Sequence, residues 1–154
     1  MEIKYLKQLK DSPNLEPSIG PREGWDMTKI ELLETKYNKG RKFPLAFREY
    51  LFLAGDFGGT GVVNEDWDDL HSDCQEDLKR FNYKVERPYF VFDNYDSQYS
   101  IFFLDEEFED PKIYILDPYG KNRGEYDLIR PGFIVTFSKL INEAIHRIKN
   151  NIPF

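Results

Sequence analysis

The order of hydrophobic patterns along the 154 residues predicts an α+β fold: an antiparallel β-sheet meander with N-terminal helices and a C-terminal helix packed on it. Apolar residues recur at helical spacing in the first third of the chain and again near its end. Between these regions, short aromatic and β-branched segments alternate with turn-forming residues, as in consecutive antiparallel hairpins. We expect a single domain over residues 1–154, because no linker or internal repeat divides the chain.

The first third predicts a short helix followed by a helical hairpin. The short helix is predicted by three apolar residues at helical spacing, Ile3, Leu6 and Leu9. Thr28 and Glu31 form a capping pair at the head of the next helix, and Gly40 can end it in a left-handed conformation. Pro44 is expected at the first position of the following helix, which Gly55 closes.

Residues 56–87 carry weaker signals. A glycine-rich loop comes first, and a short strand-like piece is expected around Val62 and Val63. Asp73 and Glu76 can cap one or two further helical turns before the next proline.

The segments YFVFD, SQYSIFFLD and PKIYIL predict at least three consecutive antiparallel strands. Residues 117–132 are expected to form a loop with one edge strand. A final helix, capped by Ser138 or Thr136, is predicted by an apolar stripe: Leu140, Ile141, Ala144, Ile145 and Ile148.

The charge of the chain excludes some partners and favours another. The chain has 21 Lys and Arg against 28 Asp and Glu, a formal net charge of -7 at pH 7. Nucleic acid and anionic membrane are disfavoured, because affinity for both comes from Lys and Arg that neutralise phosphates. The acidity is local: residues 49–117 carry -13, whereas residues 1–48 and 118–154 each carry +3. We therefore expect a basic protein partner on the middle section.

The sequence predicts a cytoplasmic protein. Its single cysteine, Cys74, cannot form an internal disulfide, which favours a reducing compartment. Lys4, Lys7 and Lys10 interrupt the apolar stretches at the N-terminus, so no signal peptide is predicted. No apolar run approaches the ~18 residues that a membrane-spanning helix needs.

No cofactor, metal or nucleophile site is predicted. The glycines of residues 55–61 resemble a phosphate-binding loop, but this loop follows a helix and leads into acidic residues. His71 and Cys74 have an H-x-x-C spacing, yet the only other histidine is His146, too few ligands for structural zinc. No Ser, Cys or Lys lies in a recognisable nucleophile motif.

The candidate functional residues lie mainly in two carboxylate-rich stretches, residues 65–77 and residues 105–110. A catalytic pair of carboxyls needs one group in an apolar pocket with a raised pKa, whereas crowded acids in turn-rich segments stay solvated. We therefore expect no enzyme but a binding surface, with exposed aromatic side chains as anchors; a charged face kept for solubility is the alternative. The predicted partner-binding residues are Glu65, Asp66, Trp67, Asp68, Asp69, Asp73, Tyr95, Asp105, Glu106 and Glu107.

Two stretches together resemble the SUKH superfamily. Residues 30–55 are similar to its I-x-x-x-E, L-P-x-x-Y/F-R/K-x-F/L-L, G signature, at Glu34, Phe43, Pro44, Phe47, Arg48, Tyr50, Leu51 and Gly55. Residues 90–116 are similar to its central hairpins, at Tyr99, Phe102, Phe103, Leu104, Asp110, Pro111 and Tyr114. TFSKLINEAI resembles the family's closing helix, so the resemblance extends from about residue 28 to residue 148. Residues 61–87 match no family pattern.

The resemblance implies an α+β fold and a non-enzymatic, protein-binding role. The superfamily includes bacterial immunity proteins of polymorphic toxin systems and fungal regulators of cell-wall glucan synthesis. Our first hypothesis is an immunity protein that neutralises a cognate toxin, such as a nuclease, through the acidic surface; the alternative is a regulatory scaffold in cell-wall glucan synthesis. Under the resemblance, Glu34, Pro44 and Gly55 determine the fold and do not form a site. A third hypothesis, a small carboxylate hydrolase, requires a carboxyl with a perturbed pKa.

Overall fold

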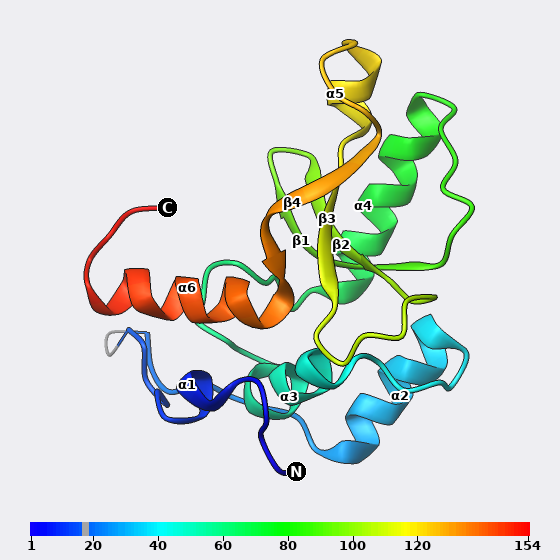
Figure 1. Ribbon diagram of the computed structural model, residues 1–154. Coiled ribbons are helices and arrows are strands. Elements are labelled where there is room, and N and C mark those ends of the chain that lie inside the picture. Colours follow the sequence, from blue (N-terminus) through cyan, green and yellow to red (C-terminus); the bar gives the residue numbers. More distant parts are fainter. Residues whose placement is uncertain (17–18) are drawn as a thin grey trace.

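The computed structural model describes residues 1–16 and 19–154 and confirms the α+β class (Figure 1). Four antiparallel strands form a sheet in the order β1-β2-β3-β4, with helices packed on it. The elements are α1 (Lys7–Lys10), α2 (Met27–Asn38), α3 (Leu45–Ala54), α4 (Trp67–Arg80), β1 (Tyr89–Tyr95), β2 (Gln98–Phe103), β3 (Lys112–Leu116), α5 (Pro118–Asn122), β4 (Ile129–Thr136) and α6 (Phe137–Lys149).

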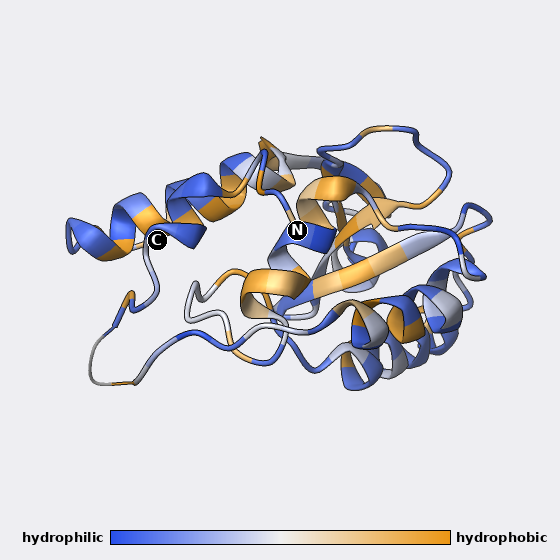
Figure 2. Cartoon of the chain, turned by 90° about the horizontal axis from the view of Figure 1, so that it is seen from below, coloured by the Kyte–Doolittle hydropathy of each residue, from blue (hydrophilic) through white to orange (hydrophobic). Residues whose placement is uncertain are grey.

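The core is centred on Phe47 of α3. The centroid of its ring lies 5.0 Å from the ring centroid of Phe90 on β1 and 5.2 Å from that of Phe102 on β2. It also lies 5.5 Å from the ring of Phe137 at the start of α6. Large aromatic side chains bury much area and favour such edge-on contacts, so this cluster ties helices to the sheet. Figure 2 shows the hydrophobic residues gathered in the centre of the molecule.

α4 packs against β1, an edge strand of the sheet. The backbone N–H of Val91 donates to the ring of His71 on α4 (3.1 Å), and the Phe92 carbonyl accepts from the Asn64 N–H (3.0 Å). These contacts satisfy backbone groups that an open edge strand would present to other chains. These contacts therefore fix α4 and the segment before it along β1.

The residues that the resemblance marks as fold determinants have structural roles. Glu34 is 2% exposed, forms an ion pair with Arg48 (2.8 Å), and accepts the backbone N–H of Phe43 (2.8 Å). Gly55 closes α3 as predicted, and a Cβ there would lie 2.7 Å from the Trp25 ring. The Glu34 contacts join α2 to α3 and to the segment between them, and the close approach at Gly55 packs the end of α3 against Trp25.

The predicted caps of the hairpin need correction. α2 begins at Met27, because the Asp26 carboxylate accepts the Lys29 N–H (2.8 Å) in place of the Thr28 pair. Lys39 already has the left-handed conformation at the end of α2 (φ 55°), with Gly40 following it (φ 76°). Pro44 is the N-cap of α3 and lies just outside the helix.

The middle and the end of the chain differ more from the prediction. Val62 and Val63 are buried in a loop and form no strand. The helix expected after Asp73 begins earlier, at Trp67, so Asp73 lies in its interior. β4 is the edge strand expected after residue 117, and α6 follows it directly, but α5 forms a short helix where only loop was expected. Neither Ser138 nor Thr136 caps α6 with its side chain; the Asp110 carboxylate accepts the Ser138 N–H (2.9 Å) instead.

Candidate functional site

The inner side of α4 is apolar and begins with Trp67. Trp67 is 5% exposed, with its ring 5.7 Å from that of Phe47 and 5.8 Å from that of Phe90. The prediction that Trp67 is an exposed anchor is therefore wrong. Its helical spacing to other buried residues is the signal that we did not use: Leu70, Cys74 and Leu78 share its side of α4.

His71 links α4 to β1 in one tautomer. Its Nδ1 lies 2.7 Å from the Trp67 carbonyl oxygen, which can only accept, so Nδ1 carries the proton. Nε2 then accepts the Val91 N–H (3.1 Å). Burial lowers the pKa of His71, which keeps the ring neutral and preserves both contacts.

Asp77 is the acid on the buried side of α4. Its carboxylate accepts the hydroxyl of Tyr99 (2.6 Å) and that of Tyr119 (3.1 Å). Burial, together with the bond to Asp77, raises the pKa of Tyr99, so the tyrosine remains a donor. This carboxylate therefore holds α4 to β2 and α5.

The outer side of α4 carries four exposed acids in one row, which we call the acidic face: Asp66, Asp69, Asp73 and Glu76. Their spacing of three or four residues places them on one side of the helix over about 15 Å. None of the four forms an ion pair with any described residue. Repulsion from Asp69 is the largest cause of a raised pKa at Asp66. The acidic face therefore keeps its negative field.

Two other predicted residues near α4 have partners inside the molecule. Asp68 is exposed but pairs with Lys36 of α2 (2.7 Å) and accepts the Tyr37 hydroxyl. Glu65 is half-buried, and its Oε1 accepts the Tyr50 hydroxyl (2.6 Å). The structure thus narrows the predicted surface on this stretch to the acidic face.

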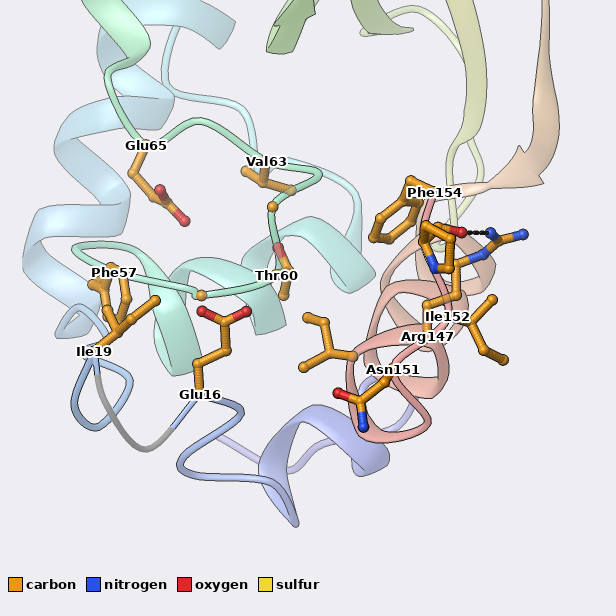
Figure 3. A pocket seen from close by; sticks show the side chains of 14 residues that line it. Glu16, Ile19, Phe57, Thr60, Val63, Glu65, Arg147, Asn151, Ile152 and Phe154 are labelled. Atoms are coloured by element: carbon orange, nitrogen blue, oxygen red, sulfur yellow. Dashed lines mark hydrogen bonds between the residues drawn. The ribbon is translucent and has the colours of Figure 1, made fainter.

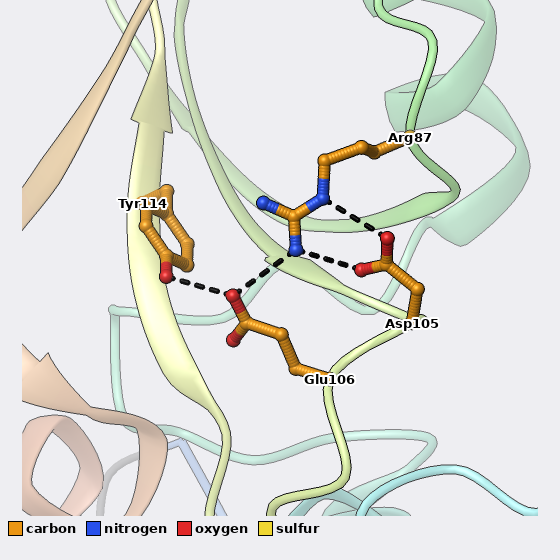
Figure 4. Close-up of polar contacts among 4 residues, drawn as sticks. All are labelled: Arg87, Asp105, Glu106 and Tyr114. Carbon is orange, nitrogen blue, oxygen red and sulfur yellow. Dashed lines mark hydrogen bonds and ion pairs between the residues drawn. The ribbon is translucent and has the colours of Figure 1, made fainter.

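The second predicted stretch, the β2–β3 turn (residues 104–111), is largely neutralised. Arg87 binds Asp105 through Nη2 (2.7 Å) and Nε (3.0 Å), and its Nη2 also lies 3.2 Å from Glu106 Oε1 (Figure 4). The same Glu106 oxygen accepts the Tyr114 hydroxyl (2.8 Å). The hydrogen bonds from Arg87 lower the pKa of Asp105, as expected for a paired carboxylate.

Of the remaining acids of the turn, two bind other parts of the molecule and one is exposed. Glu109 pairs with Lys4 and accepts the Tyr5 hydroxyl (2.7 Å), while Asp110 caps α6. Glu107 is exposed and has no ion pair to a described residue. Only this acid of the turn resembles those of the acidic face.

Tyr95 is exposed as predicted (80%) but lies at the tip of the β1–β2 hairpin. The β2–β3 turn follows the opposite end of β2, about 20 Å away for a six-residue strand. The predicted partner-binding residues are therefore not one compact site.

One carboxyl with a perturbed pKa escaped the sequence analysis. Burial raises the pKa of Asp93 on β1 to about 6, and it also raises that of Glu65. An acid in the otherwise apolar segment YFVFD was the available signal. These carboxyls meet the pKa condition of the hydrolase hypothesis, but no His, Ser or Cys side chain of the described residues is hydrogen-bonded to either one.

The described residues offer no arrangement for a bound metal. Within residues 1–16 and 19–154, no group of three or more His, Cys, Asp or Glu could hold an ion. Cys74 is buried, and burial raises the pKa of its thiol to about 12, which makes it unreactive. In the same part of the chain, no helix is long and apolar enough to cross a membrane.

Comparisons of the chain with protein-family models, curated proteins and solved structures gave no match.

Proposed function

We propose that this protein is a non-enzymatic binding module that docks a basic protein on the acidic face of α4. The observation that carries the proposal is a row of four exposed carboxylates that no described cation neutralises. Acids in the first turn also stabilise a helix through its macrodipole, which accounts for Asp69. Asp73 and Glu76 lie beyond that turn, so the macrodipole gives no reason for them.

The partner that we propose is a toxin domain, with this protein as its immunity protein in the cytoplasm. The resemblance to the SUKH superfamily supports this role, and the acidic face lies within residues 61–87, where the resemblance has no counterpart. We expect toxin-specific contacts in this segment, because the resemblance does not extend to it. A nuclease is a suitable toxin, since a surface that binds nucleic-acid phosphates is basic.

The proposal predicts that an adjoining gene encodes the toxin domain, and the test measures association of this protein with that domain. We expect the rate to fall steeply as ionic strength rises, because exposed charges steer encounter over the Debye length. Replacing Asp69→Asn, Asp73→Asn and Glu76→Gln together should slow association about tenfold at low salt. Glu107→Gln is the matched control, an exposed acid outside the acidic face, and should leave the rate unchanged.

Protection of cells is the second measurement. Co-expression of this protein should rescue growth of cells that produce the toxin domain. A rate that does not depend on salt would refute the electrostatic docking, and a failure to protect would refute the immunity role. An adjoining gene for glucan synthesis would instead favour the regulatory scaffold.

A further inference from the structure

A groove of about 720 Å³ borders the acidic face at its N-terminal end (Figure 3). The loop 57–65, the residues Glu16 and Ile19, and the end of the chain after α6 line it. Its apolar lining includes Ile19, Phe57, Val63, Ile148, Ile152 and Phe154. Glu65 also lines it and directly precedes Asp66, so a partner on the acidic face can reach the groove.

Two carboxylates, those of Glu16 and Glu65, point into the groove (Figure 3). Glu65 Oε1 accepts a hydrogen bond from the Tyr50 hydroxyl (2.6 Å), and Glu65 forms no ion pair with a described residue. Burial is the largest influence on its pKa and raises it, although hydrogen bonds from Tyr50 and from the backbone of Gly58 and Glu65 act in the opposite direction. An incoming cation would compensate the charge of this carboxylate.

The glycine-rich part of the loop 57–65 forms the wall of the groove that carries Glu65. A Cβ at Gly58 would lie 2.0 Å from the Tyr50 hydroxyl oxygen and 2.7 Å from Glu65 Oε1, so only glycine fits there. Gly59 and Gly61 have left-handed φ angles of 66° and 70°. Between them, Thr60 is 1% exposed and lines the groove, and its hydroxyl makes no hydrogen bond of ordinary geometry with the described residues. The loop thus shapes one side of the groove.

The cation among the lining residues, Arg147, is already engaged. Its Nε pairs with Glu143 (2.7 Å), and its Nη1 donates to the Pro153 carbonyl. Its guanidinium lies over the Phe154 ring, 5.3 Å from the centroid. Figure 3 shows Arg147 on the far side of the groove from Glu65, so this cation pairs with Glu143 and with neither carboxylate of the groove.

We infer that the groove receives an arginine side chain of the basic protein that docks on the acidic face. The inference rests on the proposed function and names one contact of that partner. An arginine combines an apolar stem, suited to Val63 and Ile148, with a planar cation that binds a carboxylate through two parallel hydrogen bonds and stacks on rings such as Phe57. A lysine has the charge but not the planar, weakly hydrated group.

The test titrates the full chain with N-acetyl-arginine amide and follows the backbone amide signals by NMR. We expect saturable shifts for residues 57–65, weaker ones with N-acetyl-lysine amide, and none with N-acetyl-citrulline amide, the neutral analogue. Glu16→Gln and Glu65→Gln should each weaken arginine binding about tenfold, the value of a charge-assisted hydrogen bond. Asp73→Asn is the control and should bind the arginine amide as the native chain does.

The outcomes separate this inference from the proposed function. Absence of saturable shifts in the groove, equal binding of citrulline amide, or normal binding by the exposed variant Glu16→Gln would overturn the arginine groove. The native spectrum outside the loop verifies that each variant is folded. If the groove binds arginine amide but substitutions in the acidic face do not change toxin association, the docking on α4 is overturned and the arginine groove is retained.

Discussion

The two acidic stretches, residues 65–77 and residues 105–110, are alike in sequence and differ in the structure. The first keeps a row of four exposed acids without a described cation. In the second, Arg87 binds Asp105 and Glu106, and Lys4 pairs with Glu109. Local crowding of carboxylates therefore does not by itself indicate a negative surface.

The difference arises from cations that lie far away in the sequence. Lys4 pairs with Glu109, 105 residues away, and Arg87 with Asp105, 18 residues away. Exposed pairs of this kind contribute little stability, but they cancel charge locally. A partner therefore encounters only the negative charge that these ion pairs do not cancel.

The largest expected effect concerns Asp77, the buried acid of the first stretch. Asp77→Ala should destabilise the protein by about 3 kcal/mol, because it leaves the hydroxyls of Tyr99 and Tyr119 without their charged acceptor. Urea denaturation measures the change. Asp73→Ala, four residues earlier on the exposed side, is the control; equal losses for both would contradict the distinction between the two sides of α4.

A smaller effect is expected at Asp93, which lies between the two stretches and has no ion pair to a described cation. Its pKa is raised from 3.8 to about 6, so folding takes up protons between these values. The native protein therefore loses stability as pH rises through this window. Asp93→Asn should remove the loss and stabilise the protein at pH 8 by about 2 kcal/mol.

The measurement for Asp93 is the difference in unfolding free energy between variant and native chain at several pH values. The difference cancels the opposing contribution of His71, whose lowered pKa favours the folded state above its unfolded pKa of 6.5. We expect the difference to grow from pH 4 to pH 7. A difference independent of pH would show that Asp93 titrates alike in both states.

Arg87→Met should convert the second stretch into an unneutralised one. The variant keeps apolar contact with the Phe103 ring but removes the positive charge that neutralises Asp105 and Glu106. We expect a loss of about 1 kcal/mol in stability, because the bidentate pair is partly exposed. Association with a basic test protein, lysozyme, should become faster at low salt. An unchanged rate would mean that the turn does not contribute a field.

The smallest effect on stability is expected at the acidic face. Asp73→Asn should change the unfolding free energy by no more than about 0.5 kcal/mol, because its side chain is exposed and unpaired with described residues. Thermal denaturation gives the value, with Ser72→Ala as an exposed control on the same helix. A larger loss would show that the acids hold the fold and are not kept for a partner.

The sequence predicted most elements and missed contacts between distant ones. Apolar spacing located α2, α3 and α6, and turn residues separated the strands, since both signals are local. The start of α4 was missed because Asp73 and Glu76 are good capping residues in isolation. The Asp110 cap of α6 comes from another segment, which no local pattern reveals.

Composition and pattern alone determined the α+β class, the antiparallel meander and the acidity of residues 49–117, because these depend on residue type and on short periods. Only the tertiary structure decided which acids remain free. It buried Trp67 in the core, gave Asp105 its partner Arg87 and left the acidic face open. The physical reason is that burial and ion pairing are fixed by distances between segments, which folding sets and linear order does not contain.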